Sequence, residues 1–144
     1  MEYGLQMYSV RDITDKDLDG ALKKVAEIGY KFVEFAGFFG HSAQEVKDML
    51  DKYGLRVSGT HTGWNEVADH FEETVAYHKT IGNKNIIVPG ADLSSQEKID
   101  AFIKMANEFQ AAVPCSKGQL PVLRYARGRK DVYKRQVQSA RAIL

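Results

Sequence analysis

Three glycine-led segments recur along this chain and constrain its fold more than any other feature. They read IGYKFVEFAG, YGLRVSGTHTG and IGNKNIIVPGA. Each has a polar or basic residue soon after the glycine, then a short β-rich run and a loop glycine. The leading glycines, Gly29, Gly54 and Gly82, are 25 and 28 residues apart, about the length of one strand plus one crossover helix. The repeat therefore predicts consecutive βα units.

Helical signals fill the segments between these glycines. Ser42 with Glu45 and Ser94 with Glu97 have the spacing of capping boxes, which begin helices. Gly29 is placed to end the first helix, because glycine readily adopts the left-handed cap conformation. Apolar residues recur at helical spacing in each segment, and the third such stripe runs towards Gly82 through Val67, Phe71 and Val75.

The order of these segments predicts the fold class. The expected strands lie near residues 4–10, 31–36, 55–60 and 84–89. Strands that alternate with helices indicate a parallel sheet with right-handed crossovers, either an open doubly wound sheet or a (β/α) barrel. A dinucleotide fold would place a glycine-rich phosphate loop after the first strand, and YSVRD stands there instead. This favours the barrel.

Composition indicates a soluble globular domain followed by a basic segment. Apolar residues make up 44% and charged residues 27% of the 144 residues, which suits one domain with a core. Residues 1–114 hold 12 basic and 18 acidic residues, whereas 115–144 hold 8 basic residues and one acid. This reversal divides the chain into an acidic body and a basic tail.

Four stretches of the body resemble a known family. GLQMYSVRD, ALKKVAEIGYKFVEFAG, LDKYGLRVSGTHTG and HKTIGNKNIIVPGA are similar to the N-terminal half of the sugar phosphate isomerase/epimerase family, the xylose isomerase-like TIM barrels. The resemblance covers residues 3–109 and implies four of the eight βα units of such a barrel. We expect residues 1–109 to form this half-barrel. We expect residues 110–144 to form an irregular, non-family tail, either helical or disordered, and our hypothesis for its origin is a truncated or frame-shifted reading frame.

His61 and Glu34 are the leading candidates for the site. His61 ends the third predicted strand, and the C-terminal ends of strands build the active site of a (β/α) barrel. Glu34 interrupts the apolar strand end FVEFAG, where a buried carboxylate needs a partner. The resemblance implies a histidine and a glutamate at similar places. Alternatively, His61 bonds only its own loop and Glu34 only a neighbouring strand or lysine. We expect the two to lie close together.

Aromatic residues complete the predicted substrate site. Tyr8 and Trp64 offer an apolar wall for the face of a sugar, although packing is the more common role of such residues. Arg11 either meets an anionic substrate or pairs with Asp12, and the pairing is favoured. His78 falls within a helix and is expected to face solvent or the helical shell. The sequence assigns no catalytic residue.

The resemblance implies a function for the whole family. It implies metal-assisted proton transfer next to the carbonyl of a sugar or polyol, with Mn²⁺, Mg²⁺ or Zn²⁺ bound by the later strands. We expect no metal to be held by this chain alone, and no isomerase or epimerase turnover on simple ketoses or sugar phosphates. The alternative function is a non-catalytic half-barrel that self-associates through its exposed sheet edges or binds a partner.

Other partners and compartments follow from composition. The basic tail lacks the aromatic interleaving that would favour nucleic-acid binding, so no nucleic-acid partner is expected. No stretch approaches the ~20 apolar residues of a membrane span. The N-terminus has no secretory pattern, and the single cysteine, Cys115, cannot form an internal disulfide. We therefore expect a cytoplasmic protein.

Overall fold

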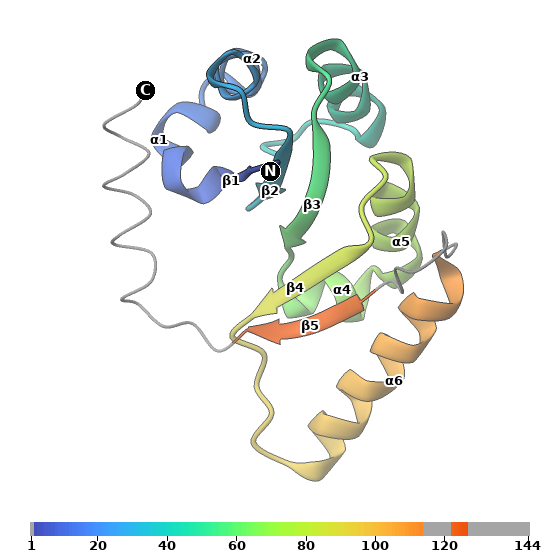
Figure 1. Ribbon diagram of the computed structural model, residues 1–144. Coiled ribbons are helices and arrows are strands. Elements are labelled where there is room, and N and C mark those ends of the chain that lie inside the picture. Colours follow the sequence, from blue (N-terminus) through green and yellow to red (C-terminus); the bar gives the residue numbers. More distant parts are fainter. Residues whose placement is uncertain (1, 114–121, 127–144) are drawn as a thin grey trace.

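A parallel sheet of five strands organises the part of the chain that the computed structural model describes, residues 2–113 and 122–126 (Figure 1). The strands lie in sequence order, and each is parallel to its neighbours. This confirms the prediction that the first four strands are parallel and adjacent in order. The strands are β1 (Gly4–Gln6), β2 (Phe32–Phe35), β3 (Arg56–His61), β4 (Asn85–Pro89) and β5 (Val122–Ala126).

The connections between the strands are mostly helical, and Figure 1 shows helices following the curved sheet. After β1 come a 3₁₀ turn, η1 (Met7–Val10), and α1 (Arg11–Thr14). The crossover helices are α2 (Leu18–Ile28), α3 (Ala43–Tyr53), α4 (Trp64–Asp69), α5 (Phe71–Thr80) and α6 (Gln96–Ala112). None of the helices in the described ranges combines the length and apolar character needed to cross a membrane.

Two apolar clusters join one face of the sheet to the helices. In the first, Val33 and Phe35 of β2 are fully buried together with residues of α2 and α3, among them Leu22 and Val46. The second joins β4 and β5 to α4, α5 and α6 through Ile86, Val88, Leu123, Val67, Val75, Phe102 and Phe109. Each such side chain contributes about 1.5–3 kcal/mol through burial. Alternate side chains of each strand therefore point towards the helices.

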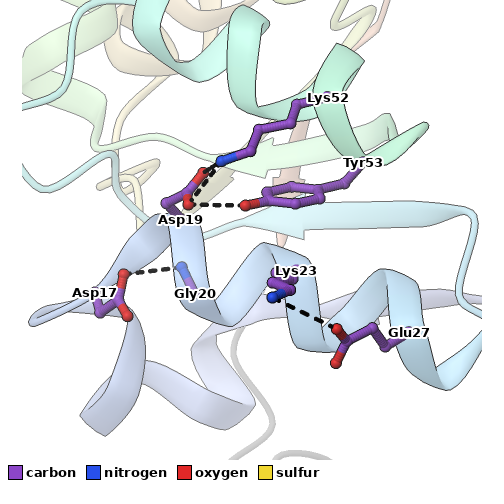
Figure 2. Close-up of polar contacts among 7 residues, drawn as sticks. All are labelled: Asp17, Asp19, Gly20, Lys23, Glu27, Lys52 and Tyr53. Atoms are coloured by element: carbon purple, nitrogen blue, oxygen red, sulfur yellow. Dashed lines mark hydrogen bonds and ion pairs between the residues drawn. The ribbon is translucent and has the colours of Figure 1, made fainter.

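Predicted caps fix the ends of the helices nearest β2. The Ser42–Glu45 capping box is present, with the Ser42 amide 2.7 Å from the Glu45 carboxylate. Gly29 ends α2 at a φ of 107°. Asp17, which was not among the predicted caps, begins α2 by accepting a hydrogen bond from the Gly20 amide, as Figure 2 shows. These local signals set the length of each crossover.

A group of polar contacts links α2 to α3 at the exposed surface of this part of the fold (Figure 2). The Tyr53 hydroxyl donates to the Asp19 carboxylate over 2.8 Å, and Lys52 Nζ lies 3.1 Å from the same group. Both bonds lower the pKa of Asp19, the one from Tyr53 most. The two helices are therefore joined by charge and hydrogen bonding outside their apolar contact.

Three local predictions are wrong. Residues 7–10 form η1 and not the end of a strand, because Met7 and Val10 are buried together at helical spacing. The third helical stripe is divided into α4 and α5, which meet at His70. Ser95, not Ser94, caps α6, because the Ser94 amide bonds to Asp92 while Ser95 accepts from Lys98 N.

The described residues extend beyond the predicted half-barrel. Helix α6 continues to Ala112, and β5 lies parallel to β4 within residues 110–144, for which an irregular tail was predicted. Leu123 of β5 is buried in the second apolar cluster beside Ile86, so an apolar residue at the right register gives this strand its place. Residues 114–121 and 127–144 of the predicted tail lie outside the described residues.

Candidate functional site

The end of β3 presents three polar residues to two different faces of the sheet. Thr60 and Thr62 are buried, and their hydroxyl oxygens lie 3.1 Å apart. Because side chains alternate along a strand, His61 between them points to the opposite face. The threonine side chains point towards the helices. His61 therefore points to the other side of the sheet, which would be the inside of a closed barrel.

Asn83 anchors the threonines on the helical side. The Asn85 amide donates to Asn83 Oδ1 over 3.1 Å, which fixes the orientation of the Asn83 side chain. Its Nδ2 then donates to the Asn85 carbonyl over 3.0 Å and to Thr60 Oγ1 over 3.1 Å, and it lies 3.3 Å from His78 Nδ1. The amide nitrogen offers no lone pair to a donor, so His78 Nδ1 is the ring nitrogen without a proton. His78 Nε2 therefore carries the proton and donates to Thr62 Oγ1 over 3.4 Å.

His78 belongs to this anchor and is 1% exposed. Of the two expected positions, solvent or helical shell, the structure shows the helical shell. Burial lowers the pKa of His78 to about 4, which keeps the ring neutral at pH 7 and agrees with its hydrogen bonds. No pattern in the sequence indicated that His78 and Thr62 would lie within hydrogen-bonding distance.

A β-bulge brings His61 to the face that carries Glu34. Val33 pairs with Val57 but Glu34 pairs with Gly59, so Ser58 is an extra residue in β3. Without it, the alternation would send His61 to the other side. Hydrogen bonds stabilise the bulge, because Ser58 Oγ donates to the Val33 carbonyl and Asn85 Nδ2 donates to the Ser58 carbonyl.

Glu34 and His61 lie together at the C-terminal end of the sheet, as predicted. His61 Nε2 is 3.3 Å from Glu34 Oε1, and the two side chains are 14% and 28% exposed. The hydrogen bond from His61 is the largest of the effects that lower the pKa of Glu34, and a bond from Gln6 adds to it. The carboxylate is therefore ionised at neutral pH and held as a hydrogen-bond acceptor.

Gln6 is a member of this group that the sequence reasoning missed. It is the last residue of β1 and pairs in register with Glu34. Its Oε1 is buried and has no hydrogen-bond partner among the described residues. The available signal was a polar residue within GLQMY, at the end of the first strand. Gln6, Glu34 and His61 thus form a polar row across β1, β2 and β3.

The two aromatic candidates lie in different surroundings. Tyr8 is in η1, just beyond the end of β1, and is 41% exposed. The Arg11 guanidinium lies over its ring at 4.4 Å and donates to its carbonyl. Trp64 begins α4 and stacks on Phe102 of α6, with ring centres 5.4 Å apart. That stacking gives Trp64 a packing role, and contact of Tyr8 or Trp64 with a substrate stays a prediction.

The described residues do not by themselves form a metal site. Glu34 and His61 supply two groups that ligate metals, but they are bonded to each other. Within the described ranges, no three or more His, Cys, Asp or Glu side chains gather in a way that could hold an ion.

The outer strands of the described sheet are β1 and β5. Near β1, a depression of about 390 Å³ is lined by Tyr3, Gly4, Ile28, Gly29 and Tyr30. Tyr3 is 62% exposed and Ile28 is 40% exposed. Association through these edges stays a prediction.

Comparison with known proteins gives matches among solved structures only. No family profile matches the sequence, and no curated protein matches it. A sugar phosphate isomerase/epimerase from Parabacteroides distasonis is 22% identical, with a TM-score of 0.63 over 86% of this chain and 54% of that one. A xylose isomerase domain containing protein from Salmonella typhimurium is 12% identical, with a TM-score of 0.60 over 76% of this chain and 45% of that one.

A third structure is an IolI protein with a zinc atom bound. It is 14% identical, with a TM-score of 0.56 over 78% of this chain and 47% of that one. This chain spans about half the length of these three structures. The likeness shows the class of fold: the described residues have the fold of about half of a TIM (β/α)₈ barrel. The predicted fold class is thereby confirmed.

Proposed function

We propose that this protein binds a sugar or polyol at the C-terminal ends of β1, β2 and β3, with Glu34 and His61 as hydrogen-bonding groups. The corresponding reaction would be a proton transfer next to the carbonyl group of the substrate, of the kind that isomerases and epimerases catalyse. The observation that carries the proposal is the 3.3 Å pair between His61 Nε2 and Glu34 Oε1, at the end of the sheet where this fold class builds its sites. The similarity to the sugar phosphate isomerase/epimerase from Parabacteroides distasonis supports the substrate class.

The electrostatics of Glu34 favour a binding role over a basic one. An effective general base has a pKa near the working pH, whereas hydrogen bonds from His61 and Gln6 lower the pKa of this carboxyl. An ionised carboxylate accepts strong hydrogen bonds from hydroxyl groups, which are abundant on a polyol. Glu34 therefore orients the substrate, and no catalytic base is assigned among the described residues.

Titration of the 144-residue chain with D-fructose, followed by NMR chemical shifts, tests this proposal. A hydrogen bond to a charged group contributes about 1.5–3 kcal/mol. Glu34→Gln and His61→Asn should therefore weaken binding by about 10- to 100-fold. D-Fructose is chosen because it is a simple ketose whose binding requires no turnover.

The chain offers a matched control pair. His70 Nδ1 lies 3.6 Å from Glu73 Oε2, and these side chains are 64% and 85% exposed. His70→Asn and Glu73→Gln make the same chemical changes away from the polar row and should leave the affinity unchanged. Equal weakening by both sets of variants, or no binding of D-fructose by the unmodified chain, would contradict the proposal.

A further inference from the structure

The loop that follows β2 contains a phenylalanine in an unusual backbone conformation. Phe39 has a φ of 53°, and it is the one non-glycine residue with positive φ in the described ranges. Gly40 follows at 82°, and the His41 amide donates to the Phe38 carbonyl over 3.0 Å. Two positive φ angles inside such a hydrogen bond have the pattern of a type I′ turn.

A bulky side chain is unfavourable at the first corner of this turn. That position favours asparagine, aspartate or glycine, because other side chains clash with the backbone at positive φ. A loop that served only to connect β2 to α3 would be more stable with one of those residues. Phe39 therefore costs folding free energy at this site, and backbone strain of this kind clusters at ligand-binding positions.

Contacts on both sides hold the turn in place. The Phe38 ring lies 4.4 Å from that of Tyr77 and 5.3 Å from that of Phe35. The Tyr77 hydroxyl donates to the His41 carbonyl over 2.8 Å, and the capping box of α3 begins at the next residue. The surrounding structure therefore imposes the conformation of Phe39.

The ring of Phe39 has little role in the core. Phe38 packs on the first apolar cluster, whereas Phe39 is in neither cluster nor among the residues packed against them. Its exposed fraction is 41%. A Cβ atom added at Gly37 or Gly40 would meet nothing within 4 Å, so there is open space beside the two glycines that flank this part of the loop. Core packing does not explain why an aromatic ring is kept here.

We infer that Phe39 is a specificity-determining residue that contacts the apolar C–H face of the bound sugar or polyol. The turn begins four residues after Glu34, at the C-terminal end of β2, where ligands of (β/α) barrels bind. Glu34 and His61 would bond the hydroxyl groups, and the ring would cover carbon atoms, a common division of roles in ligand sites. This inference rests on the proposed function.

Phe39→Asn and Phe39→Tyr test the inference in the full chain, with D-fructose as the probe. Asparagine suits the turn but lacks the ring, so it should weaken D-fructose binding about fivefold or more. Its unfolding midpoint should be unchanged or a few degrees higher, because asparagine adopts this backbone conformation with less strain than phenylalanine. Tyrosine keeps the ring and should bind within about twofold of the unmodified chain.

Ile103→Ala is the control, because Ile103 is a 51% exposed apolar residue on α6, and it should change neither property. Unchanged D-fructose affinity in Phe39→Asn, beside weakened affinity in Glu34→Gln, would overturn this inference alone. No binding by the unmodified chain would overturn the proposed function and this inference with it. Weaker binding by Phe39→Asn, with tyrosine restoring it, supports the inference at any unfolding midpoint.

Discussion

The two faces of β3 hold two histidines in opposite circumstances. His78 lies on the helical face, is 1% exposed and is surrounded by neutral hydrogen-bonding groups. His61 lies on the opposite face, is partly exposed and pairs with a carboxylate. The first arrangement completes the hydrogen bonds of a buried group, which stabilises the fold. The second keeps polar groups at the surface of the sheet, where they can meet a ligand.

This difference shows how one strand end serves two purposes. The threonines on either side of His61 are fixed by Asn83 and His78, so the backbone between them has one arrangement. A site residue is placed accurately when its supporting shell is rigid. The polar groups on the helical face of β3 therefore position His61 from behind, without contacting Glu34 on the other face.

Asn83→Ala should give the largest effect on stability. It removes the donor facing His78 Nδ1 and the side chain that bonds both the amide and the carbonyl of Asn85, which leaves these groups without those partners. At about 1–3 kcal/mol for each such group, the free energy of unfolding should fall by about 4 kcal/mol. Urea denaturation at pH 7 measures it. Asn65→Ala, at an exposed position of α4, is the control, and equal effects of the two would show that the network adds no stability.

The second largest effect on stability is expected from acid, which protonates His78 on the helical face of β3. Its pKa is about 4 in the folded chain against 6.5 ordinarily, so between these values the unfolded chain binds a proton that the folded chain does not. Stability should be full above pH 6.5 and should fall by about 3 kcal/mol as the pH approaches 4. His78→Gln should flatten this dependence, whereas His70→Gln should leave it. An unchanged dependence in His78→Gln would assign it to other groups.

The smallest effect is expected where polar contacts are exposed. Asp19→Asn weakens the bonds to Lys52 and Tyr53 that join α2 to α3 (Figure 2). Water and salt screen such contacts, so the midpoint of urea unfolding should move far less than in Asn83→Ala. The difference from the unmodified chain should shrink further in 1 M NaCl. A loss of stability as large as that of Asn83→Ala would contradict the expectation that the exposed contacts contribute less than the buried ones.

Patterns that act locally made much of the fold predictable. Apolar spacing and caps placed α2 and α3, and the glycine repeat placed β2, β3 and β4 within a residue or two. The meeting of Glu34 with His61 followed from their places at the ends of successive parallel strands. These features depend on residues close together in the sequence or on a rule common to parallel sheets.

The remaining features depend on contacts between distant residues. The bulge at Ser58 is stabilised by Asn85, 27 residues away, and it decides which face His61 occupies. Gln6 joins the site only because β1 pairs in register with β2. The place of β5 depends on the burial of Leu123 beside β4. No local pattern carries this information, so sequence reasoning missed these features.

Imidazole NMR of both histidines during D-fructose titration tests the central claim most directly, namely that β3 divides a binding face from an anchoring face. At pH 7, the ring nitrogen signals of His61 should move with saturable dependence on D-fructose. The signals of His78 should stay in place and keep the pattern of a neutral ring protonated at Nε2. Movement of the His78 signals with those of His61, or no movement of His61 while D-fructose binds elsewhere, would contradict the account.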